Sequence, residues 1–212
     1  MFGQMGSTLL YLLVFGFSLL FFWLAEGQFN KERALYSGGH YLSNGDANSR
    51  RGIGIGTLCA AMGILIVCLF AGMRATSVGS DTQGYPVTFT NAAIADGSFL
   101  AFLNDPIGAG DEPLGALLVW ICSRFGAGVG PLLFSYQLLT ILPVYLAVQR
   151  FDGRIPLTVS MAIYLLWFYN NSLNMMRQSV SCALLLLALS IYLARNQIKV
   201  STVVLCVAAA LF

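Results

Sequence analysis

The sequence predicts an all-α fold, a transmembrane helical bundle that forms a single integral membrane domain over residues 1–212. Of the residues 58% are hydrophobic and only 9% are charged, and the mean hydropathy is +0.77. A water-soluble domain carries about a quarter charged residues. The apolar stretches lack the ten-residue alternation of a membrane barrel, so helices are expected to be the spanning elements.

Five uncharged windows are long enough to cross a bilayer, which takes a helix of about 20 apolar residues. In chain order the expected spans are Thr8–Ala25, Ile53–Met73, Pro131–Val148, Ile155–Ser172 and Ser179–Ala194. A sixth window, Val200–Phe212, is too short to span and is expected to enter the membrane only in part. We therefore expect the chain to be the N-terminal part of a longer domain, truncated at its C-terminus.

The basic residues predict the orientation of these spans, because cytoplasmic loops carry an excess of Lys and Arg. Eight bases fall on one side of the five crossings and three on the other, which places the N-terminus outside the cytoplasm. The three bases on the outer side are Arg74, Arg124 and Arg177. An arginine on the side that the rule disfavours usually has a local task.

The outer loop, residues 74–130, holds most of the acids and an apolar segment of its own, Glu112–Phe125. This segment is too short to span, so we expect a helix that lies at the interface or re-enters the membrane, broken afterwards by Gly126, Gly128 and Gly130. Irregular backbone at membrane depth is tolerated only against protein or a water-filled cavity. A cavity that opens outward is therefore expected here.

Three marks in this outer region resemble the EpsG family, relatives of the Wzy-type polysaccharide polymerases. The first is Arg74-x-x-x-Val78-Gly79-x-Asp81-Thr82-x-x-Tyr85-x-x-x-Phe89, directly after the second span. The second is Glu112-Pro113 at the start of the apolar segment, and the third is Asn174-x-x-Arg177-Gln178 before the fifth span. The resemblance runs from the first span to Phe212, although the family is usually longer.

The resemblance implies a reaction on sugars carried by undecaprenyl diphosphate, and the marks contain the residue types that this reaction needs. Guanidinium groups hold phosphate in two-pronged hydrogen bonds, so Arg74 and Arg177 are the expected diphosphate clamps. An acceptor hydroxyl needs a base, for which Asp81 and Glu112 are the candidates; which of them is the base stays open. Tyr85 and Gln178 are expected to contact substrate, with Trp120 as a further stacking surface for sugar.

Each of these residues also has a structural interpretation. The two arginines would serve equally well as side chains that reach the lipid headgroups. Asp81 follows Gly79 and Ser80, as a turn residue does, and Glu112 before Pro113 is a typical helix start. Arg124 matches no motif and is expected to be an interface anchor.

The function expected from the resemblance is that of a membrane glycosyltransferase, a polymerase that joins undecaprenyl-diphosphate-linked repeat units in bacterial exopolysaccharide or O-antigen synthesis. Its expected location is the bacterial inner membrane, with the lipid bilayer and the lipid-linked oligosaccharide as partners, and a flippase and a chain-length regulator of the same pathway as possible ones. No cofactor, metal or nucleic acid is expected. The alternatives are a flippase of lipid-linked sugars, or an inactive truncated remnant of the polymerase.

Overall fold

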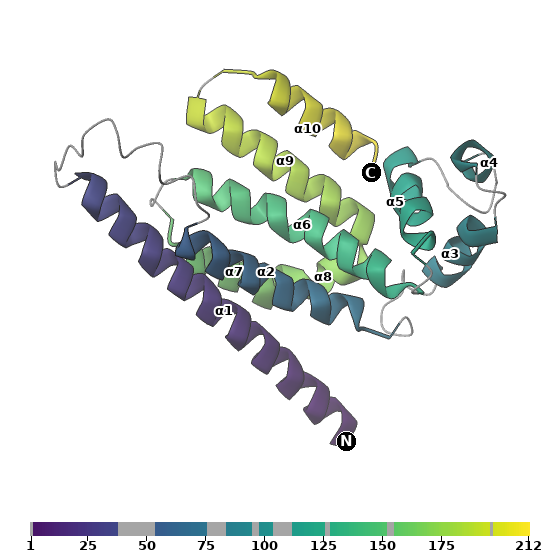
Figure 1. Cartoon of the computed structure of the whole chain (residues 1–212), viewed down its shortest axis with the longest axis horizontal. Coiled ribbons are helices and arrows are strands. Elements are labelled where there is room, and N and C mark those ends of the chain that lie inside the picture. Colours follow the sequence, from purple (N-terminus) through teal and green to yellow (C-terminus); the bar gives the residue numbers. More distant parts are fainter. Residues whose placement is uncertain are drawn as a thin grey trace.

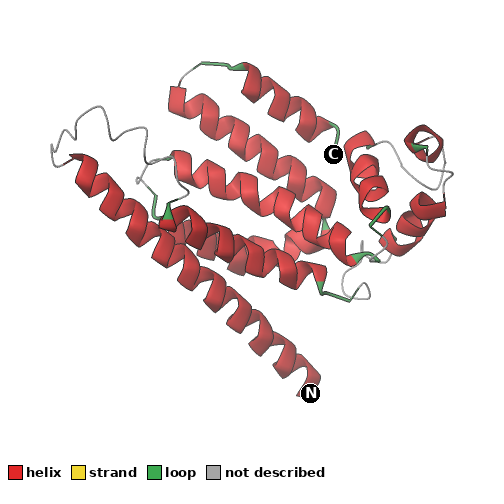
Figure 2. Cartoon of the chain, viewed as in Figure 1, coloured by secondary structure: helices red, strands yellow, loops and turns green. Residues whose placement is uncertain are grey.

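A computed structural model describes residues 2–37, 54–75, 84–94, 98–103, 112–125, 128–151, 155–195 and 197–212, and every regular element among them is helical (Figures 1 and 2). The all-α prediction is confirmed. The elements are α1 (Phe2–Ser37), α2 (Ile55–Gly72), α3 (Tyr85–Ile94), α4 (Phe99–Leu103), α5 (Pro113–Ser123), α6 (Gly130–Arg150), α7 (Leu157–Ile163), the π-helix η2 (Tyr164–Phe168), α8 (Tyr169–Asn174), α9 (Met176–Arg195) and α10 (Val200–Ala210).

Four helices in the described part of the chain are long and apolar enough to cross a membrane. They lie at Thr8–Ala34 within α1, Ile55–Gly72, Gly130–Arg150 and Met176–Ala194. The predicted fourth span differs from these because its helical segment, residues 157–174, changes to a π-helix over Tyr164–Phe168 and so contains no single long α-helix. Helix α10 is apolar and short, as expected for Val200–Phe212.

The first helix is much longer than its apolar window of Thr8–Ala25, because it runs from Phe2 to Ser37. The residues after Glu26 include several polar ones, but Gln, Lys, Glu and Arg are all good helix formers and continue the helix beyond the apolar stretch. The charged residues from Glu26 onward therefore end the apolar window without ending the helix.

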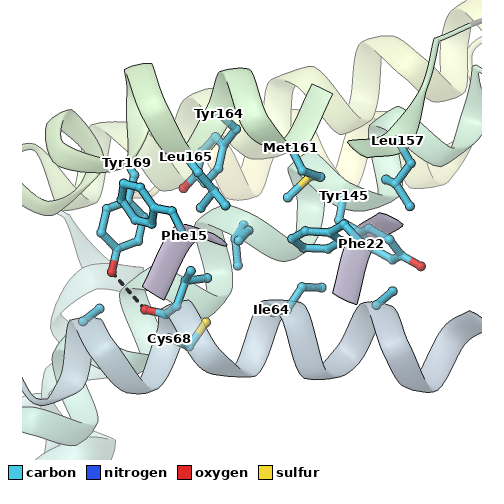
Figure 3. Packing of buried hydrophobic residues seen from close by; sticks show 14 of the residues in the cluster. Phe15, Phe22, Ile64, Cys68, Tyr145, Leu157, Met161, Tyr164, Leu165 and Tyr169 are labelled. Carbon is cyan, nitrogen blue, oxygen red and sulfur yellow. Dashed lines mark hydrogen bonds between the residues drawn. The ribbon is translucent and has the colours of Figure 1, made fainter. Parts of the chain in front are cut away.

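The four long helices pack in the order α1, α2, α6 and α9, with the short α10 packed on α9 and α7 packed on α1 and α6 (Figure 1). The main hydrophobic core lies between α1, α2, α6 and the segment from α7 to α8, where Phe22, Val67, Met161 and Leu165 are fully buried (Figure 3). Tyr169 is also buried there, and its hydroxyl donates a hydrogen bond of 2.9 Å to the Val67 carbonyl.

Remote polar side chains fix the contacts of α1. Ser18 donates a hydrogen bond of 2.9 Å to the carbonyl of Gly63, where the missing side chain lets α1 and α2 approach closely. Further along α1, a Glu26 carboxylate oxygen accepts hydrogen bonds from the backbone amide and the hydroxyl of Thr158. Because α7 has no side-chain cap of its own, Glu26 satisfies its first turn from another helix.

The short helices α3, α4 and α5 lie together at the end of the bundle where α2 ends and α6 and α9 begin (Figure 1). We call this the α5 end. Helix α5 forms within the predicted apolar segment, with Glu112 at its N-cap and Pro113 as its first residue. Gly128 has a positive φ of 73°, as a break requires, but Gly130 is the first residue of α6 and breaks nothing. Gly126 lies outside the described residues.

Candidate functional site

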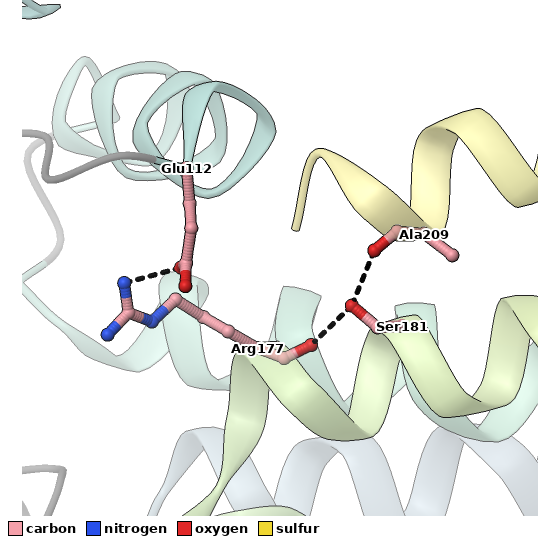
Figure 4. A network of polar contacts seen from close by, with 4 residues as sticks. All are labelled: Glu112, Arg177, Ser181 and Ala209. Atoms are coloured by element: carbon pink, nitrogen blue, oxygen red, sulfur yellow. Dashed lines mark hydrogen bonds and ion pairs between the residues drawn. The ribbon is translucent and has the colours of Figure 1, made fainter.

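The α5 end contains an ion pair between Arg177 and Glu112, which belong to two of the motifs found in the sequence and lie 65 positions apart in the chain (Figure 4). A guanidinium nitrogen of Arg177 contacts a carboxylate oxygen of Glu112. The side chains are 47% and 36% exposed, although the paired carboxylate oxygen of Glu112 is itself buried. A ligand that enters from the α5 end therefore meets a pre-formed pair of opposite charges.

Local backbone geometry directs these two side chains toward each other. Helical structure is interrupted at Met175, whose φ of −111° and ψ of 60° separate α8 from α9, and Arg177 is then the second residue of α9. Glu112 is extended, with φ −115° and ψ 91°, directly before α5. The Leu114 amide in the first turn of α5 donates a hydrogen bond of 3.2 Å to the Leu211 carbonyl just after α10. The end of α10 thus holds the start of α5 beside α9.

Two tyrosines complete the surroundings of the ion pair. Tyr85 is the first residue of α3, and its ring centroid lies 5.7 Å from that of Tyr136 on α6. A methyl group placed on Gly115 of α5 would lie 3.5 Å from both the Tyr136 hydroxyl oxygen and Cδ of Arg177. Residues from α3, α5, α6 and α9 therefore converge on one small volume, which we call the Arg177 site.

Arg74 lies at the same end of the bundle and makes a different contact. One of its guanidinium nitrogens donates a hydrogen bond of 3.2 Å to the Leu173 carbonyl, in the last turn of α8. Burial lowers the pKa of Arg74 below its usual value, while the nearby Tyr11 and Tyr169 act in the opposite direction. An arginine stays charged at neutral pH despite such a shift. Arg74 thus contacts the chain just before the break at Met175, and Arg177 lies just after that break.

The remaining predicted site residues have different positions. Asp81 lies outside the described residues. Gln178 follows Arg177 on α9 and is exposed. Trp120 is covered on its ring face by the Arg124 guanidinium, 4.9 Å from the ring centroid, and meets the Phe99 ring edge-on at 5.9 Å. Arg124 also donates a hydrogen bond of 3.2 Å to the Ala92 carbonyl of α3, so it joins α5 to α3.

Sequence reasoning missed Tyr136 and Gly115. Tyr136 sits in an apolar span, where aromatic residues are usual, and only its position near the start of that span sets it apart. Gly115 is three residues after Glu112, on the same face of a helix that begins there. A helical register for Glu112–Phe125 would therefore have placed Gly115 beside the Glu112 side chain.

The fold and the site together define a multi-pass membrane protein with a charged and aromatic site at one end of its helical bundle. The family model described as the EpsG family matches residues 57–212, and the chain belongs to this family. Membership fits a Wzy-like polymerase of polysaccharide biosynthesis and implies a lipid-linked oligosaccharide substrate in a membrane. No curated protein and no solved structure gives a significant match to the chain.

Proposed function

We propose that the Arg177 site binds the diphosphate of an undecaprenyl-diphosphate-linked glycan and transfers that glycan to a second lipid-linked repeat unit, at the outer face of the bacterial inner membrane. The observation that carries the proposal is the contact between Arg177 and Glu112. It joins a candidate clamp for the leaving group and a candidate base for the acceptor in one place.

The position of Arg177 suits an anion. The first turn of a helix exposes backbone N–H groups and carries a partial positive charge, so anions are favoured there. Arg177 adds a full positive charge to the first turn of α9. A guanidinium also offers a planar fork of donors that matches the oxygens of a phosphate. The first turn of α9 thus combines two independent attractions for a diphosphate.

The transfer exchanges one bond for another. The acceptor hydroxyl oxygen attacks the anomeric carbon of the donor sugar, and the bond from that carbon to the diphosphate oxygen breaks with inversion. The bonding electron pair leaves with undecaprenyl diphosphate, while the hydroxyl proton passes to the Glu112 carboxylate. Arg177 stabilises the negative charge that grows on the leaving oxygen, so it acts on the transition state as well as on binding.

Glu112 cannot serve fully as a base while it is held by Arg177. An arriving diphosphate competes with Glu112 for the guanidinium, and the displaced carboxylate becomes available to the acceptor hydroxyl. In this mechanism the donor substrate itself activates the base. Asp81 is the alternative base and lies outside the described residues.

Arg74 and Tyr85 take supporting roles in the proposal. Arg74 is the second cation at the α5 end, and its hydrogen bond to Leu173 fixes the end of α8 four residues before Arg177. Tyr85 lies beside Tyr136 and offers an aromatic face on which a sugar ring can stack. Gln178, exposed next to Arg177, is the further substrate contact.

Replacing Arg177 or Arg74 by Ala tests the proposal. In the bacterium that makes this protein, each variant is expected to abolish high-molecular-weight polymer on a gel while the protein stays in the membrane. Arg124→Ala is the matched control, because Arg124 lies at the same end but contacts Trp120 and α3. Polymer of normal length in the Arg177 variant would refute the clamp assignment.

A flippase is the second candidate, because of a buried polar cluster in the bundle. Gln137 donates a hydrogen bond of 3.0 Å to the Tyr164 hydroxyl and accepts one of 3.3 Å from Ser172, next to the π-helix η2. Polar groups and broken helices inside a membrane bundle are typical of transporters. The cluster is uncharged and its members satisfy one another, which favours packing over transport. Movement of a fluorescent lipid diphosphate across vesicles containing the purified protein would support the flippase instead.

A further inference from the structure

Tyr136 has a buried hydroxyl that the packing of the protein does not use. The residue is only 1% exposed, and its hydroxyl oxygen forms no hydrogen bond within the described part of the chain. Tyr85 acts on this hydroxyl as a hydrogen-bonding neighbour, and Arg177 and Glu112 act on it electrostatically. No pair of atoms at the Tyr136 hydroxyl, however, has the distance and angle of a hydrogen bond within the described residues. Most buried polar groups in proteins are hydrogen-bonded, so an exception needs a reason.

The direction of the side chain supplies the reason. The Tyr136 ring packs with the apolar residues of α5, α6 and α9, a role that Phe would fill equally well. Its hydroxyl instead emerges at Gly115, where the absence of a side chain leaves it and Cδ of Arg177 each 3.5 Å from the same point. The unsatisfied donor is therefore aimed into the Arg177 site.

We infer that Tyr136 is a substrate-contacting residue, whose hydroxyl donates a hydrogen bond to an oxygen of the lipid diphosphate held by Arg177. The inference rests on the proposed function and adds a ligand contact to it. A tyrosine hydroxyl ordinarily keeps its proton to about pH 10, so it acts as a donor at neutral pH. Together the neutral donor and the guanidinium satisfy two different phosphate oxygens, and Glu112 remains free to take the acceptor proton.

The test uses Tyr136→Phe in the purified protein, with farnesyl diphosphate as the probe. A hydrogen bond to a charged group contributes enough to lower affinity about tenfold when it is lost. We therefore expect about tenfold weaker binding, while the melting temperature without ligand stays the same or rises, because the variant loses only an unsatisfied buried group.

Tyr169→Phe is the matched control. Tyr169 is also fully buried, but its hydroxyl is bonded to the Val67 carbonyl. This variant is expected to melt at a lower temperature and to bind farnesyl diphosphate normally. If the Tyr136 hydroxyl had a merely structural role, Tyr136→Phe would likewise melt at a lower temperature and bind farnesyl diphosphate normally. That result would overturn the inference.

Two further measurements separate this inference from the function on which it rests. If Arg177→Ala loses farnesyl diphosphate and Tyr136→Phe binds it as the unaltered protein does, the inference is wrong and the proposed function stands. If the unaltered protein does not bind farnesyl diphosphate, both are wrong. Inorganic pyrophosphate is expected to bind more weakly than farnesyl diphosphate, and equal binding would contradict a lipid-linked ligand.

Discussion

The ion pair of Arg177 and Glu112 is weak enough to be exchanged. Both side chains are more than a third exposed, so water screens their attraction, and pairs of this kind contribute at most about 1 kcal/mol. A diphosphate carries more negative charge than one carboxylate and presents more acceptor oxygens to the same guanidinium. The pair therefore keeps Arg177 in place between substrates without competing strongly for it.

Glu112→Gln should separate binding from catalysis. The amide keeps the size of the side chain and loses the charge that competes with the diphosphate, so affinity for farnesyl diphosphate is expected to rise up to about fivefold, the equivalent of about 1 kcal/mol. Polymer formation should fall about a hundredfold or more, because the acceptor hydroxyl loses its base. Affinity is measured by titration and polymer by gel.

The control for this variant is Glu32→Gln, an exposed acid on α1 that should change neither property. Weaker binding of farnesyl diphosphate by Glu112→Gln would contradict competition between Glu112 and the diphosphate for Arg177. Normal polymer formation by this variant would show that Glu112 is not the base.

At the residue scale, the sequence was sufficient to single out Arg177, Glu112 and Tyr85, which the fold brings together. The resemblance of their motifs to those of the EpsG family, together with the residue types that the implied reaction needs, carried that prediction. Tyr136 could not be predicted in the same way, because its role depends on which face of an apolar helix meets Gly115. The polar residues of this span, such as Gln137 and Thr140, are themselves buried, so polarity in the sequence does not show which face of α6 meets α5.

At the scale of elements, the contact between α2 and α6 at the α5 end depends on two glycines. A methyl group on Gly130 would lie 2.8 Å from the Gly72 carbonyl oxygen, and one on Gly72 would lie 3.1 Å from the Gly130 carbonyl oxygen. The first distance is shorter than a carbon atom and a backbone oxygen tolerate, so the helices would have to move apart. Arg74 follows Gly72 by two residues and would move with it.

Gly130→Ala is therefore expected to destabilise the protein by about 1–3 kcal/mol, the usual cost of overpacking. Thermal unfolding in detergent measures this change. Gly16→Ala is the matched control, because Gly16 is exposed on α1 and a methyl group there has no neighbour within 4 Å. That variant should be neutral or more stable by about 0.5–1 kcal/mol, since Ala is the better helix former. Equal stability of the two variants would contradict a close contact between α2 and α6.

The buried cluster beside η2 gives a second prediction for the helices. Gln137→Leu removes the hydrogen bonds that join α6 to Tyr164 and Ser172, and such bonds contribute about 1 kcal/mol in membrane proteins. A loss of this size in thermal stability is expected. Ser190→Ala should cost less, because the hydrogen bond that Ser190 donates within the described residues goes to Leu187 in its own helix. If Gln137→Leu were more stable than the unaltered protein, the hydrogen bonds of Gln137 would not be what stabilises the contact between α6 and the segment of Tyr164 and Ser172.

Apolar windows predicted where most long helices lie but not how each is built. Windows at residues 53–73, 131–148 and 179–194 correspond to α2, α6 and α9 within a few residues. The window at 155–172 is helical as expected, yet it contains a π-helical turn at Tyr164–Phe168, which hydropathy does not predict. The length of α1 beyond Glu26 follows from helix propensity, a different signal from hydropathy.

At the scale of the whole molecule, the basic residues separate between the two ends of the bundle. Arg74, Arg124 and Arg177 lie at the α5 end, whereas Lys31 and Arg33 of α1, Arg150 of α6, and Lys199 before α10 lie at the other. The excess of bases in cytoplasmic loops then predicts that the α5 end faces outward. The proposed function needs this orientation, because it places the transfer at the outer face of the membrane.

Cysteine labelling tests the orientation at two exposed positions. Phe125, next to α5, is 71% exposed and Ile198, before α10, is 75% exposed. After replacement of the five native free cysteines, Phe125→Cys is expected to react with a membrane-impermeant maleimide on intact spheroplasts. Ile198→Cys should react only after the membrane is permeabilised. The reverse result would place Arg177 and Glu112 on the cytoplasmic side. Their ion pair would survive that result, but a role in joining glycans at the outer face would not.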